Sequence, residues 1–572
     1  MSSSELILKL IQNAGVEGEI KLSPVPKPEM GDLAFSCFEL AKAQGKNPVE
    51  CARDLAAKID SRLHGNDNVD DCVVERVVAF GPYVNFFLNS GSIAKNIISD
   101  IQKQGKKYGF NDVGKSKKVV IEYPSNNTHK ELHIGHLRNI CIGNSLTNIF
   151  RVNGFNIEPI NYLNDFGAHV AKCLWGLEKF HKGEKPPKGE EQKWLGEIYA
   201  EASIYLEAHP EEKEESFAMQ KKLEARDRSV WSIFKKTRQW SIDGFDKVFK
   251  ELGVKHNRVF YEQDVKDDGQ KIVDNLLNTK IAQVGEGGAI IVDLNKFNLD
   301  IGLLRKSNGA GLYLTSDLGL AVAKNKKYKN ISESIHLTGS EQNFYFKQLF
   351  KILELAGYKY KMTHIGYGLV MLPEGKMSSR TGKVVLYDDV RDLVYNKVLE
   401  ETTKRHPDWN KKKLANVSLK IALAAIKFEF LKHEANKTII FDAAMATKFE
   451  GFTGPYILYM VARINSMLRK GKVKLKNIDF SLLKESEEKQ LVLLLGEYGE
   501  VIKKSFDNYN PSVLTKYSFD VAQAFSNFYA KHSVLNNENT ELVKARLALC
   551  GATKQVLENC LATMSIEVID IM

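Results

Sequence analysis

Two histidines and a glycine at the start of a predicted helix could bind phosphate. His133, Gly135 and His136 precede apolar residues that recur at helical spacing from Leu137 to Phe150. The free N–H groups and partial positive charge of a helix N-terminus attract phosphate. Imidazoles can donate hydrogen bonds to phosphate oxygens, and a glycine lets a phosphate or a flat ring approach the backbone. An isolated H-x-x-H pair is more simply a helix cap or a solvent-facing pair.

A second stretch with phosphate-binding chemistry lies in residues 375–382, which read GKMSSRTG. It follows an apolar, strand-like run from Ile365 to Leu372 and the break at Pro373. A short glycine-flanked loop that carries a lysine, an arginine and two serines can fold over phosphates and neutralise them. Taken alone, a solvated basic loop is the simpler interpretation.

The elements around the histidines predict a strand, a polar turn and a helix. Val119 to Tyr123 is a short apolar run typical of a buried strand, and Pro124 ends it. Similar runs alternate with amphipathic helices, which predicts a parallel, doubly wound sheet. Neither G-x-G-x-x-G nor G-x-x-x-x-G-K-[ST] follows the first strand, which disfavours nicotinamide cofactors and Walker-type ATP hydrolysis.

The second half of the sheet is predicted to begin near residues 288–292. It would carry the stretches 312–317 and 339–342 before the 375–382 loop. Glu122 and Asp317 then both follow predicted parallel strands, at the edge where such sheets bind ligands.

Composition favours an ordinary multidomain protein of the cytoplasm. The chain has 572 residues, which is too long for one core, with 43% hydrophobic and 27% charged residues. A formal net charge of +10 fits a polyanionic partner without requiring one. The seven cysteines form no C-x-x-C and no Cys/His cluster, so we expect no metal site and no disulfide framework. No signal peptide and no membrane-length apolar run is present.

The strings N-x-x-K-E-L-H-I-G-H-L-R-N and G-K-M-S-S-R-T-G resemble the HIGH and KMSKS motifs of class I aminoacyl-tRNA synthetases, and most closely those of the arginine enzymes. The resemblance covers nearly the whole chain. It implies a Rossmann-like α/β catalytic domain, an N-terminal α+β tRNA-binding domain and a C-terminal all-α anticodon-binding bundle. We place these domains at 115–390, 1–114 and 391–572, with a highly charged insertion at about 168–267 in the catalytic domain. Beyond Tyr387 the apolar pattern predicts helices at 414–431, 441–470, 485–504, 513–531 and 541–563.

The resemblance implies a two-step reaction in which ATP and arginine form arginyl-adenylate and pyrophosphate, and tRNA(Arg) then accepts the arginine. Mg²⁺ would enter with ATP, and no tightly bound cofactor is expected. Positioning and charge neutralisation must carry such catalysis, because no protein nucleophile is needed. The resemblance suggests that the protein is a monomer. The residues implied for catalysis and ATP binding are His133, Gly135, His136, Lys376, Met377, Ser378 and Ser379.

Arginine itself needs carboxylates placed to accept in-plane hydrogen bonds from a flat, permanently charged guanidinium. The resemblance implies that the arginine pocket is formed by Glu122, Asn127, Tyr313, Asp317 and Gln342. Physically, the side chains at 313 and 317 suit the guanidinium, and the other three suit the ammonium group and the surroundings of the reacting carboxylate. Each of these could instead be a strand-end polar residue bonded to the backbone. The fourth KMSKS position is Ser379 rather than lysine. Arginine enzymes that lack this lysine usually have one just before HIGH, so the resemblance implies a compensating phosphate role for Lys130; whether Arg380 shares that role stays open.

The expected tRNA contacts lie at the two ends of the chain. GD-x-A at 31–34 and GP-x-x-N at 81–85 resemble the N-terminal domain that reads the D-loop corner of tRNA. An aromatic ring can stack on a base and an amide can read its edge, although Tyr83 could equally be a strand-core residue. Tyr459 could likewise be a core aromatic, and the final D-I-M departs from the usual family ending. The residues implied are Tyr83, Asn85, Tyr459, Arg463, Tyr529 and Met572.

Two other interpretations remain at this point. The chain could be a synthetase for another amino acid, which the paired carboxylates, the N-terminal domain and the missing zinc-ligand set disfavour. It could also be a catalytically silent RNA-binding relative. The presence of His133, Gly135, His136 and Lys376 disfavours that possibility.

Overall fold

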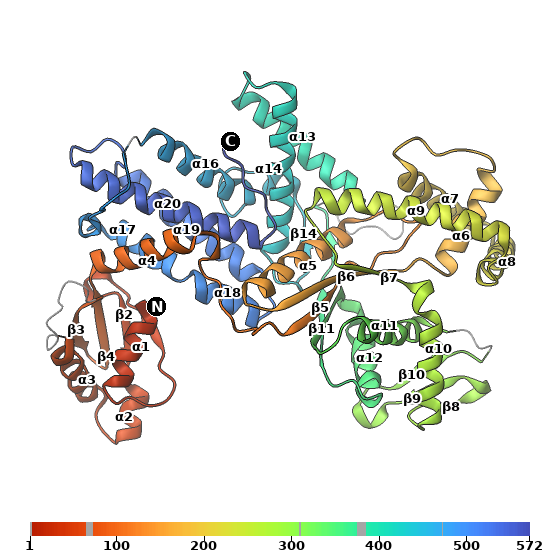
Figure 1. Ribbon diagram of the computed structural model, residues 1–572, viewed down its shortest axis with the longest axis horizontal. Helices are drawn as coiled ribbons and strands as arrows, with labels where there is room; N and C mark the ends of the chain where they lie inside the picture. Colours follow the sequence, from red (N-terminus) through yellow and green to blue (C-terminus); the bar gives the residue numbers. More distant parts are fainter. Residues whose placement is uncertain (1–2, 64–72, 308–310, 374–384, 472) are drawn as a thin grey trace.

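A central parallel sheet organises the molecule, and helical regions flank it on both sides (Figure 1). The computed structural model describes residues 3–63, 73–307, 311–373, 385–471 and 473–572. The sheet has strand order β12-β11-β5-β6-β7, and every neighbouring pair is parallel. The predicted fold class is confirmed. The strands are β5 (Lys118–Glu122), β6 (Asn156–Leu163), β7 (Arg258–Tyr261), β11 (Ile331–Gly339) and β12 (Lys361–Tyr367).

β5 lies in the middle because its side chains are apolar on both faces. Val119 and Ile121 are fully buried in the cluster that contains helix α5 (Ile134–Val152), whereas Val120 is fully buried on the other face with Leu320 of helix α11 (Tyr313–Lys327). The chain continues from β5 to β6 on one side, and β11 pairs on the other. The carboxyl ends of β5 and β11 therefore form a topological switch point, the usual place for a ligand crevice.

Four helices separate β6 from β7 along the chain and project to one side of the sheet (Figure 1). They fall inside the charged stretch 168–267, which also contains β7, a member of the central sheet. These helices are α6 (Ala168–Phe180), α7 (Glu191–Ala208), α8 (Lys213–Glu224) and α9 (Arg228–Glu251).

The stretch predicted to open the second half of the sheet does not belong to it. β9 (Ile290–Asp293) pairs antiparallel with β8 (Gln283–Val284) and β10 (Ile301–Arg305) in a separate three-stranded sheet. This small sheet packs with α10 (Glu262–Asn278), α11 and α12 (Asn343–Leu355) around its own core. The prediction failed because a short apolar run has the same appearance in either kind of sheet.

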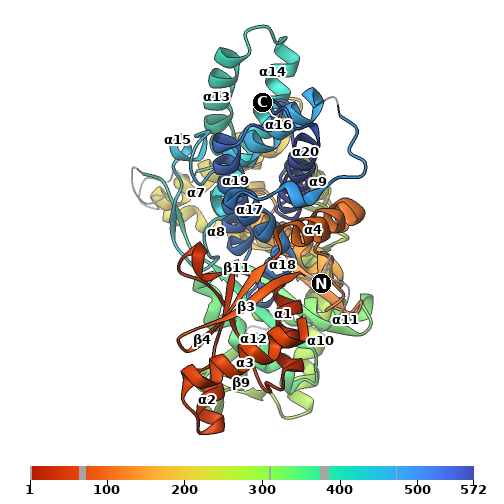
Figure 2. The same ribbon diagram turned by 90° about the vertical axis from the view of Figure 1, so that its left-hand side faces the viewer.

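The N-terminal region is a four-stranded antiparallel sheet with order β1-β2-β4-β3, covered by helices (Figure 2). Asp32, from the GD-x-A stretch, accepts hydrogen bonds from Leu88 N at 2.7 Å and from Lys489 Nζ at 2.7 Å, which ties this region to the C-terminal bundle. Its elements are α1 (Ser3–Asn13), β1 (Leu22–Pro24), β2 (Leu33–Ser36), α2 (Phe38–Gln44), α3 (Pro48–Leu63), β3 (Val74–Phe80) and β4 (Tyr83–Leu88), and α4 (Ser90–Gln104) follows.

The C-terminal region is a helical bundle, as predicted, but two predicted helices are broken. The non-helical stretch 447–453 divides 441–470 into α15 (Ala443–Ala446) and α16 (Gly454–Lys470), and Glu497 separates α17 (Ser486–Gly496) from α18 (Tyr498–Asp507). The remaining helices are α13 (Tyr387–Arg405), α14 (Lys411–Leu431), α19 (Ser512–Lys531) and α20 (Thr540–Thr563).

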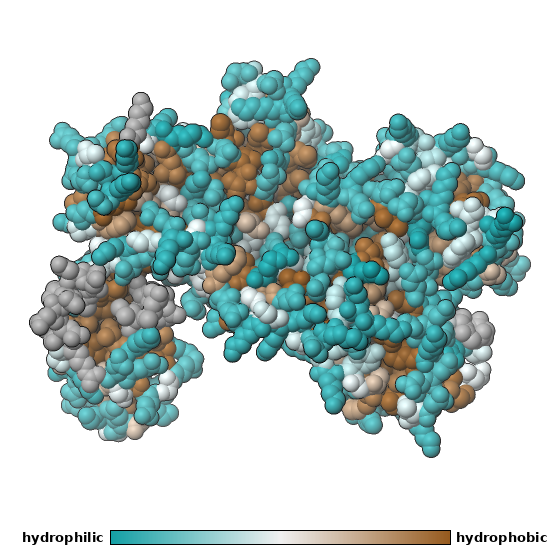
Figure 3. All heavy atoms as spheres, viewed as in Figure 1, coloured by the Kyte–Doolittle hydropathy of each residue, from teal (hydrophilic) through white to brown (hydrophobic). Residues whose placement is uncertain are grey.

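Most of the face shown in Figure 3 is hydrophilic, and the apolar side chains are largely in the interior. Within the described ranges, every helix is too short or too polar to span a lipid bilayer.

Arg138 of α5 joins the central sheet to two segments that are far apart in the chain, 368–371 and 434–440. Its side chain is fully buried, and its Nη1 donates to Gly368 O and Lys437 O, both at 2.7 Å, while Nη2 donates to Glu434 O at 3.1 Å. These carbonyls precede β13 (Val370–Met371) and β14 (Ile439–Ile440), which pair with each other. Arg138 thereby fixes these segments relative to the start of α5.

We expect Arg138→Met to destabilise the protein by about 3 kcal/mol, because it leaves buried carbonyls without donors. Urea unfolding of the purified variant measures this, and Arg138→Lys should lose less. An R138M midpoint equal to that of the wild type would show that the carbonyls find other partners.

Candidate active site

A cavity of about 810 Å³ opens at the carboxyl end of the sheet, between the 127–130 turn and the starts of α10 and α11. Three predicted site residues line it: Asn127, Lys130 and Tyr313. Tyr199 of α7 and Glu224 of α8 close it from the helical region, so the charged insertion forms part of the wall.

Two carboxylates meet where α10 and α11 pack closely. The backbones touch because both helices carry glycines: a Cβ on Gly319 would lie 2.2 Å from Val265 O, and one on Gly269 would lie 2.3 Å from Thr315 O. This contact brings Glu262, at the start of α10, close to Asp317, on the second turn of α11. Glu262 lines the cavity, and the negative charge of Asp317 helps to raise the pKa of Glu262.

Burial is the main cause of the unusual acidity of this pair. Burial, followed by the charges of the nearby Asp165 and Asp317, raises the pKa of Glu262 to about 7. Burial likewise raises the pKa of Asp317 to about 7; Glu122 adds to this effect, whereas the Tyr345 hydroxyl and Lys324 oppose it. Two neighbouring carboxylates with raised pKa values at the edge of a cavity are candidates for binding a cationic group.

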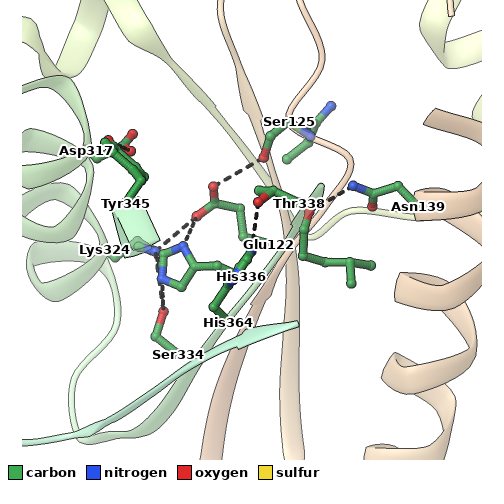
Figure 4. A network of polar contacts seen from close by, with 12 residues as sticks. Glu122, Ser125, Asn139, Asp317, Lys324, Ser334, His336, Thr338, Tyr345 and His364 are labelled. Atoms are coloured by element: carbon green, nitrogen blue, oxygen red, sulfur yellow. Dashed lines mark hydrogen bonds and ion pairs between the residues drawn. The ribbon is translucent and has the colours of Figure 1, made fainter. Parts of the chain in front are cut away.

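The Tyr345 hydroxyl donates to Asp317 Oδ2 and fixes that carboxylate (Figure 4). Asp317 was predicted to follow a strand, and this is wrong: residues 313–317 begin helix α11. Thr315 Oγ1 accepts from Leu312 N at 3.0 Å and so caps the helix, a local signal that outweighs the apolar, strand-like composition of the stretch.

Glu122 is buried at the end of β5, and its two oxygens have different partners (Figure 4). Its Oε2 lies 3.1 Å from Lys324 Nζ and 3.3 Å from His336 Nδ1, and its Oε1 accepts from Ser125 Oγ at 3.2 Å. Among the described residues, the hydroxyl of buried Tyr162 on the neighbouring β6 has no hydrogen-bond partner. Burial and the surrounding carboxylates, Asp317 first, raise its pKa well above the usual value.

The two predicted histidines cap helix α5, and this fixes which nitrogen carries the proton. His133 Nδ1 accepts from Gly135 N at 3.1 Å and from His136 N at 3.4 Å, and His136 Nδ1 accepts from His133 N at 3.2 Å. Both rings are therefore neutral with the proton on Nε2. A Cβ on Gly135 would lie 2.9 Å from His133 Cε1, so only glycine permits this ring position.

Burial lowers the pKa of His133 to about 4 and that of His136 well below its usual value, and Lys130 contributes to both shifts. Lys130 thus links the histidine pair to the cavity that it lines. Its Nζ lies 4.5 Å from the centre of the Tyr199 ring, a cation–π contact that holds the ammonium group at the cavity wall. The capping alternative and the phosphate-binding hypothesis are compatible here, because capping uses Nδ1 and leaves the Nε2–H donors.

The residues predicted for the second phosphate-binding loop, Lys376, Met377, Ser378, Ser379 and Arg380, lie outside the described residues. The described segments on either side of 374–384 lie beside the start of α5. Ile134 N donates to Val385 O at 2.9 Å, and Tyr387 N donates to Leu132 O at 2.8 Å. On the other side, Arg138 holds Gly368 just before β13.

The remaining predicted arginine contacts are peripheral. Tyr313 is 75% exposed at the cavity mouth, and Gln342 is exposed at the carboxyl end of β11 and is absent from the cavity lining. Sequence reasoning missed Glu262. It follows the strand-like run Val259–Tyr261, and a carboxylate directly after a parallel strand is the signal that could have found it.

The predicted tRNA contacts of the N-terminal region differ in exposure. Tyr83 is 42% exposed, and its ring lies edge-on to Phe38 with the centroids 6.1 Å apart, so it is not a core residue. Asn85 is buried, and its Nδ2 donates to Met30 O at 2.9 Å.

The C-terminal candidates come together. Arg463 lies over the Tyr529 ring at 4.3 Å and near the Tyr459 ring at 5.9 Å, and all three side chains are half-buried. Met572 is also half-buried, and the tail before it contacts α16 where Asn465 Nδ2 donates to Asp570 Oδ1 at 3.5 Å.

No group of three or more His, Cys, Asp or Glu side chains in the described ranges could hold a metal ion. The six cysteines recorded as free there are all buried.

Comparison with known proteins identifies the family. Residues 97–443 match the family described as tRNA synthetases class I (R), catalytic domain. Residues 3–88 match the arginyl tRNA synthetase N terminal domain, and residues 457–572 match the DALR anticodon binding domain. The chain is 35% identical over 570 residues to an arginine–tRNA ligase of Clostridium beijerinckii, which covers 99% of this chain and 98% of the relative.

The chain belongs to the arginyl-tRNA synthetase family.

Solved structures agree with this assignment at the level of the fold. An arginyl-tRNA synthetase of Thermus thermophilus superposes with a TM-score of 0.81 over 99% of both chains at 24% identity. One from Plasmodium falciparum superposes with a TM-score of 0.78 over 99% of both chains at 21% identity. The three matched segments follow one another in the order expected for an arginyl-tRNA synthetase from the motifs in the sequence.

Proposed function

We propose that the cavity at the end of β5 is where this arginine–tRNA ligase binds arginine, and that the start of α5 binds the phosphates of ATP. The activity is that of the family: the enzyme uses ATP to join arginine to tRNA. One observation carries the placement of the site. Glu262, a carboxylate with a raised pKa, lines a cavity that Lys130 connects to the His133–His136 cap, and Asp317, whose pKa is also raised, lies close to Glu262 although it is not among the lining residues.

The guanidinium of arginine binds between Asp317 and Glu262 in this proposal, with Tyr313 closing the mouth of the cavity. Two carboxylates can accept in-plane hydrogen bonds from several N–H groups of a guanidinium, which a lysine ammonium does not present. Glu122 and Asn127 take the α-ammonium group, and Gln342 reaches the substrate from the end of β11.

The phosphates of ATP lie at the N-terminus of α5. The Nε2–H groups of His133 and His136 donate to phosphate oxygens, and Gly135 leaves the backbone N–H groups accessible. Lys130 supplies a fixed positive charge. Lys376, Met377, Ser378 and Ser379 close over the pyrophosphate side, and Mg²⁺ enters with ATP as part of the substrate.

The first step is in-line attack of the arginine carboxylate on the α-phosphorus, which breaks the bond to pyrophosphate. Negative charge grows on the phosphate oxygens, and the two imidazole N–H groups and Lys130 stabilise it. In the second step a hydroxyl of the terminal tRNA adenosine (the 2′-OH in class I enzymes) attacks the adenylate carbonyl carbon, and AMP leaves.

The tRNA contacts of the proposal are at the two ends of the chain. The exposed ring of Tyr83 stacks on a D-loop base, and Asn85, two residues further along the same strand, completes that site. Arg463 with the two tyrosines beside it reads unstacked anticodon bases. The full anticodon set is Tyr459, Arg463, Tyr529 and Met572. We further propose domain limits of 1–114, 115–390 and 391–572, a monomer, and a cytoplasmic location.

The test is pyrophosphate exchange with each amino acid, with and without tRNA. Arginine should support exchange when tRNA is present, and only weakly without it. Exchange that depends on lysine or cysteine and not on arginine would exclude the proposed pocket.

Arginine use should depend on pH. Below pH 7 the pair formed by Asp317 and Glu262 holds protons and attracts the guanidinium weakly, whereas above pH 7 both carboxylates are ionised. We therefore expect kcat/KM for arginine to rise from pH 6 to pH 8 and then level off. Initial rates at limiting arginine measure this. A profile that is flat across this range would contradict the placement.

A further inference from the structure

Lys324 is a buried lysine on the helix that carries two proposed arginine contacts. The residue is 1% exposed and lies in the interior of α11. Tyr313, Asp317 and Lys324 lie within about 40° of one another around the helix axis, so they form one stripe. Helical side chains lean toward the helix N-terminus, which directs the ammonium group of Lys324 back toward Asp317 and the strand ends.

The ammonium group contacts three polar side chains, all of them in the protein interior (Figure 4). Its Nζ lies 3.1 Å from Glu122 Oε2, 3.3 Å from Ser334 Oγ and 3.3 Å from His336 Nε2. Since Lys324 and Ser334 both donate toward Nε2, His336 is neutral, with its proton on Nδ1 facing Glu122 Oε2 at 3.3 Å. Lys324 is therefore the cation that balances Glu122.

We infer that Lys324 is a positioning residue for arginine binding: its ammonium group holds one oxygen of Glu122 inside the sheet, so that the other faces the substrate. The held oxygen is Oε2. Oε1 has only the neutral hydroxyl of Ser125 as its described partner and stays available for the α-ammonium group. This inference rests on the proposed function, because Glu122 is a proposed contact of arginine.

The surrounding charges give Lys324 a second effect on the same site. The groups that face Asp317 are Tyr345 on α12, Glu122 on β5, Tyr162 on β6 and Glu262 on α10, and none of them is a cation. His336 and His364, the imidazoles nearby, have pKa values lowered by burial and are neutral. Lys324 thus keeps the pKa of Asp317 lower than it would otherwise be.

The test is a mutant cycle on the full-length enzyme with tRNA, with kcat and KM for arginine measured from pH 6 to pH 9. Lys324→Met should raise KM for arginine at pH 7 by about 100-fold. It should leave KM for ATP within about twofold and should move the rise of kcat/KM to higher pH. Lys324→Arg should restore most of the loss. The control is Lys326→Met, an exposed lysine of the same helix that pairs with Asp268, and it should change neither constant.

The double variant Lys324→Met with Glu122→Gln leaves no unpaired buried charge, so it keeps the test decisive if the single variant fails to fold. If Lys324 acts through Glu122, the double variant should match Glu122→Gln alone in KM for arginine. If Glu122→Gln strongly raises KM for arginine and the double variant shows the sum of the two single effects, Lys324 does not act through Glu122. That result would overturn the inference and leave the proposed pocket intact. An unimpaired Glu122→Gln would overturn the proposed role of Glu122, and the inference with it.

Discussion

Replacement of Asp317 by asparagine is expected to lower kcat/KM for arginine by about 10³-fold at pH 8, because the guanidinium loses a buried ionic partner. The side-chain shape is retained, and the Tyr345 hydroxyl can still donate to the remaining oxygen. The loss should fall on KM for arginine and leave KM for ATP unchanged, since the phosphates bind at α5. Steady-state aminoacylation at varied arginine and ATP separates the two constants.

An aspartate-to-asparagine substitution outside the site serves as the control for Asp317→Asn. Asp300 is exposed in the loop before β10, and Asp300→Asn should leave both KM values as they are. If Asp317→Asn retained the wild-type KM for arginine, the guanidinium would have to bind at another place.

Removal of the His136 donor is expected to lower kcat by about 10²- to 10³-fold, as for the loss of one hydrogen bond to a transition-state oxyanion. Substitution by asparagine or by glutamine separates the two functions of the His136 ring, which are capping through Nδ1 and donation through Nε2–H. In His136→Asn the side-chain oxygen replaces Nδ1 and can still accept from His133 N, but the Nε2–H donor is lost. In His136→Gln an N–H group stands near the position of Nε2 while the cap is lost.

We therefore expect His136→Asn to be stable but slow, and His136→Gln to be less stable but faster. Single-turnover adenylate formation and thermal unfolding of both variants measure this. The reverse order, with the asparagine variant the faster, would show that this histidine acts only as a helix cap.

The parts of the fold that follow local patterns were predictable. β5, α5 and the helices α14, α19 and α20 lie within a few residues of their predicted positions, because each has a clear apolar period. The break between α15 and α16 and the separate sheet of β9 depend on what packs against those segments. Local composition does not contain that information.

The same distinction applies to the site. Glu122 and Asp317 were found from their expected positions after parallel strands and from the family resemblance, and the structure brings both to the cavity end of the sheet, although Asp317 lies on a helix. Glu262 was missed because the strand before it is only four residues long and falls within the charged insertion. Lys324 was missed because nothing in its neighbourhood of exposed lysines marks it as buried.

The most direct measurement is a crystal structure of the enzyme with L-arginine bound. We predict that the guanidinium lies at hydrogen-bond distance, about 3 Å, from the carboxylates of both Asp317 and Glu262. The reacting carboxylate should point toward Lys130 and the start of α5. An arginine whose guanidinium contacts neither carboxylate, or that binds outside this cavity, would contradict the proposed site.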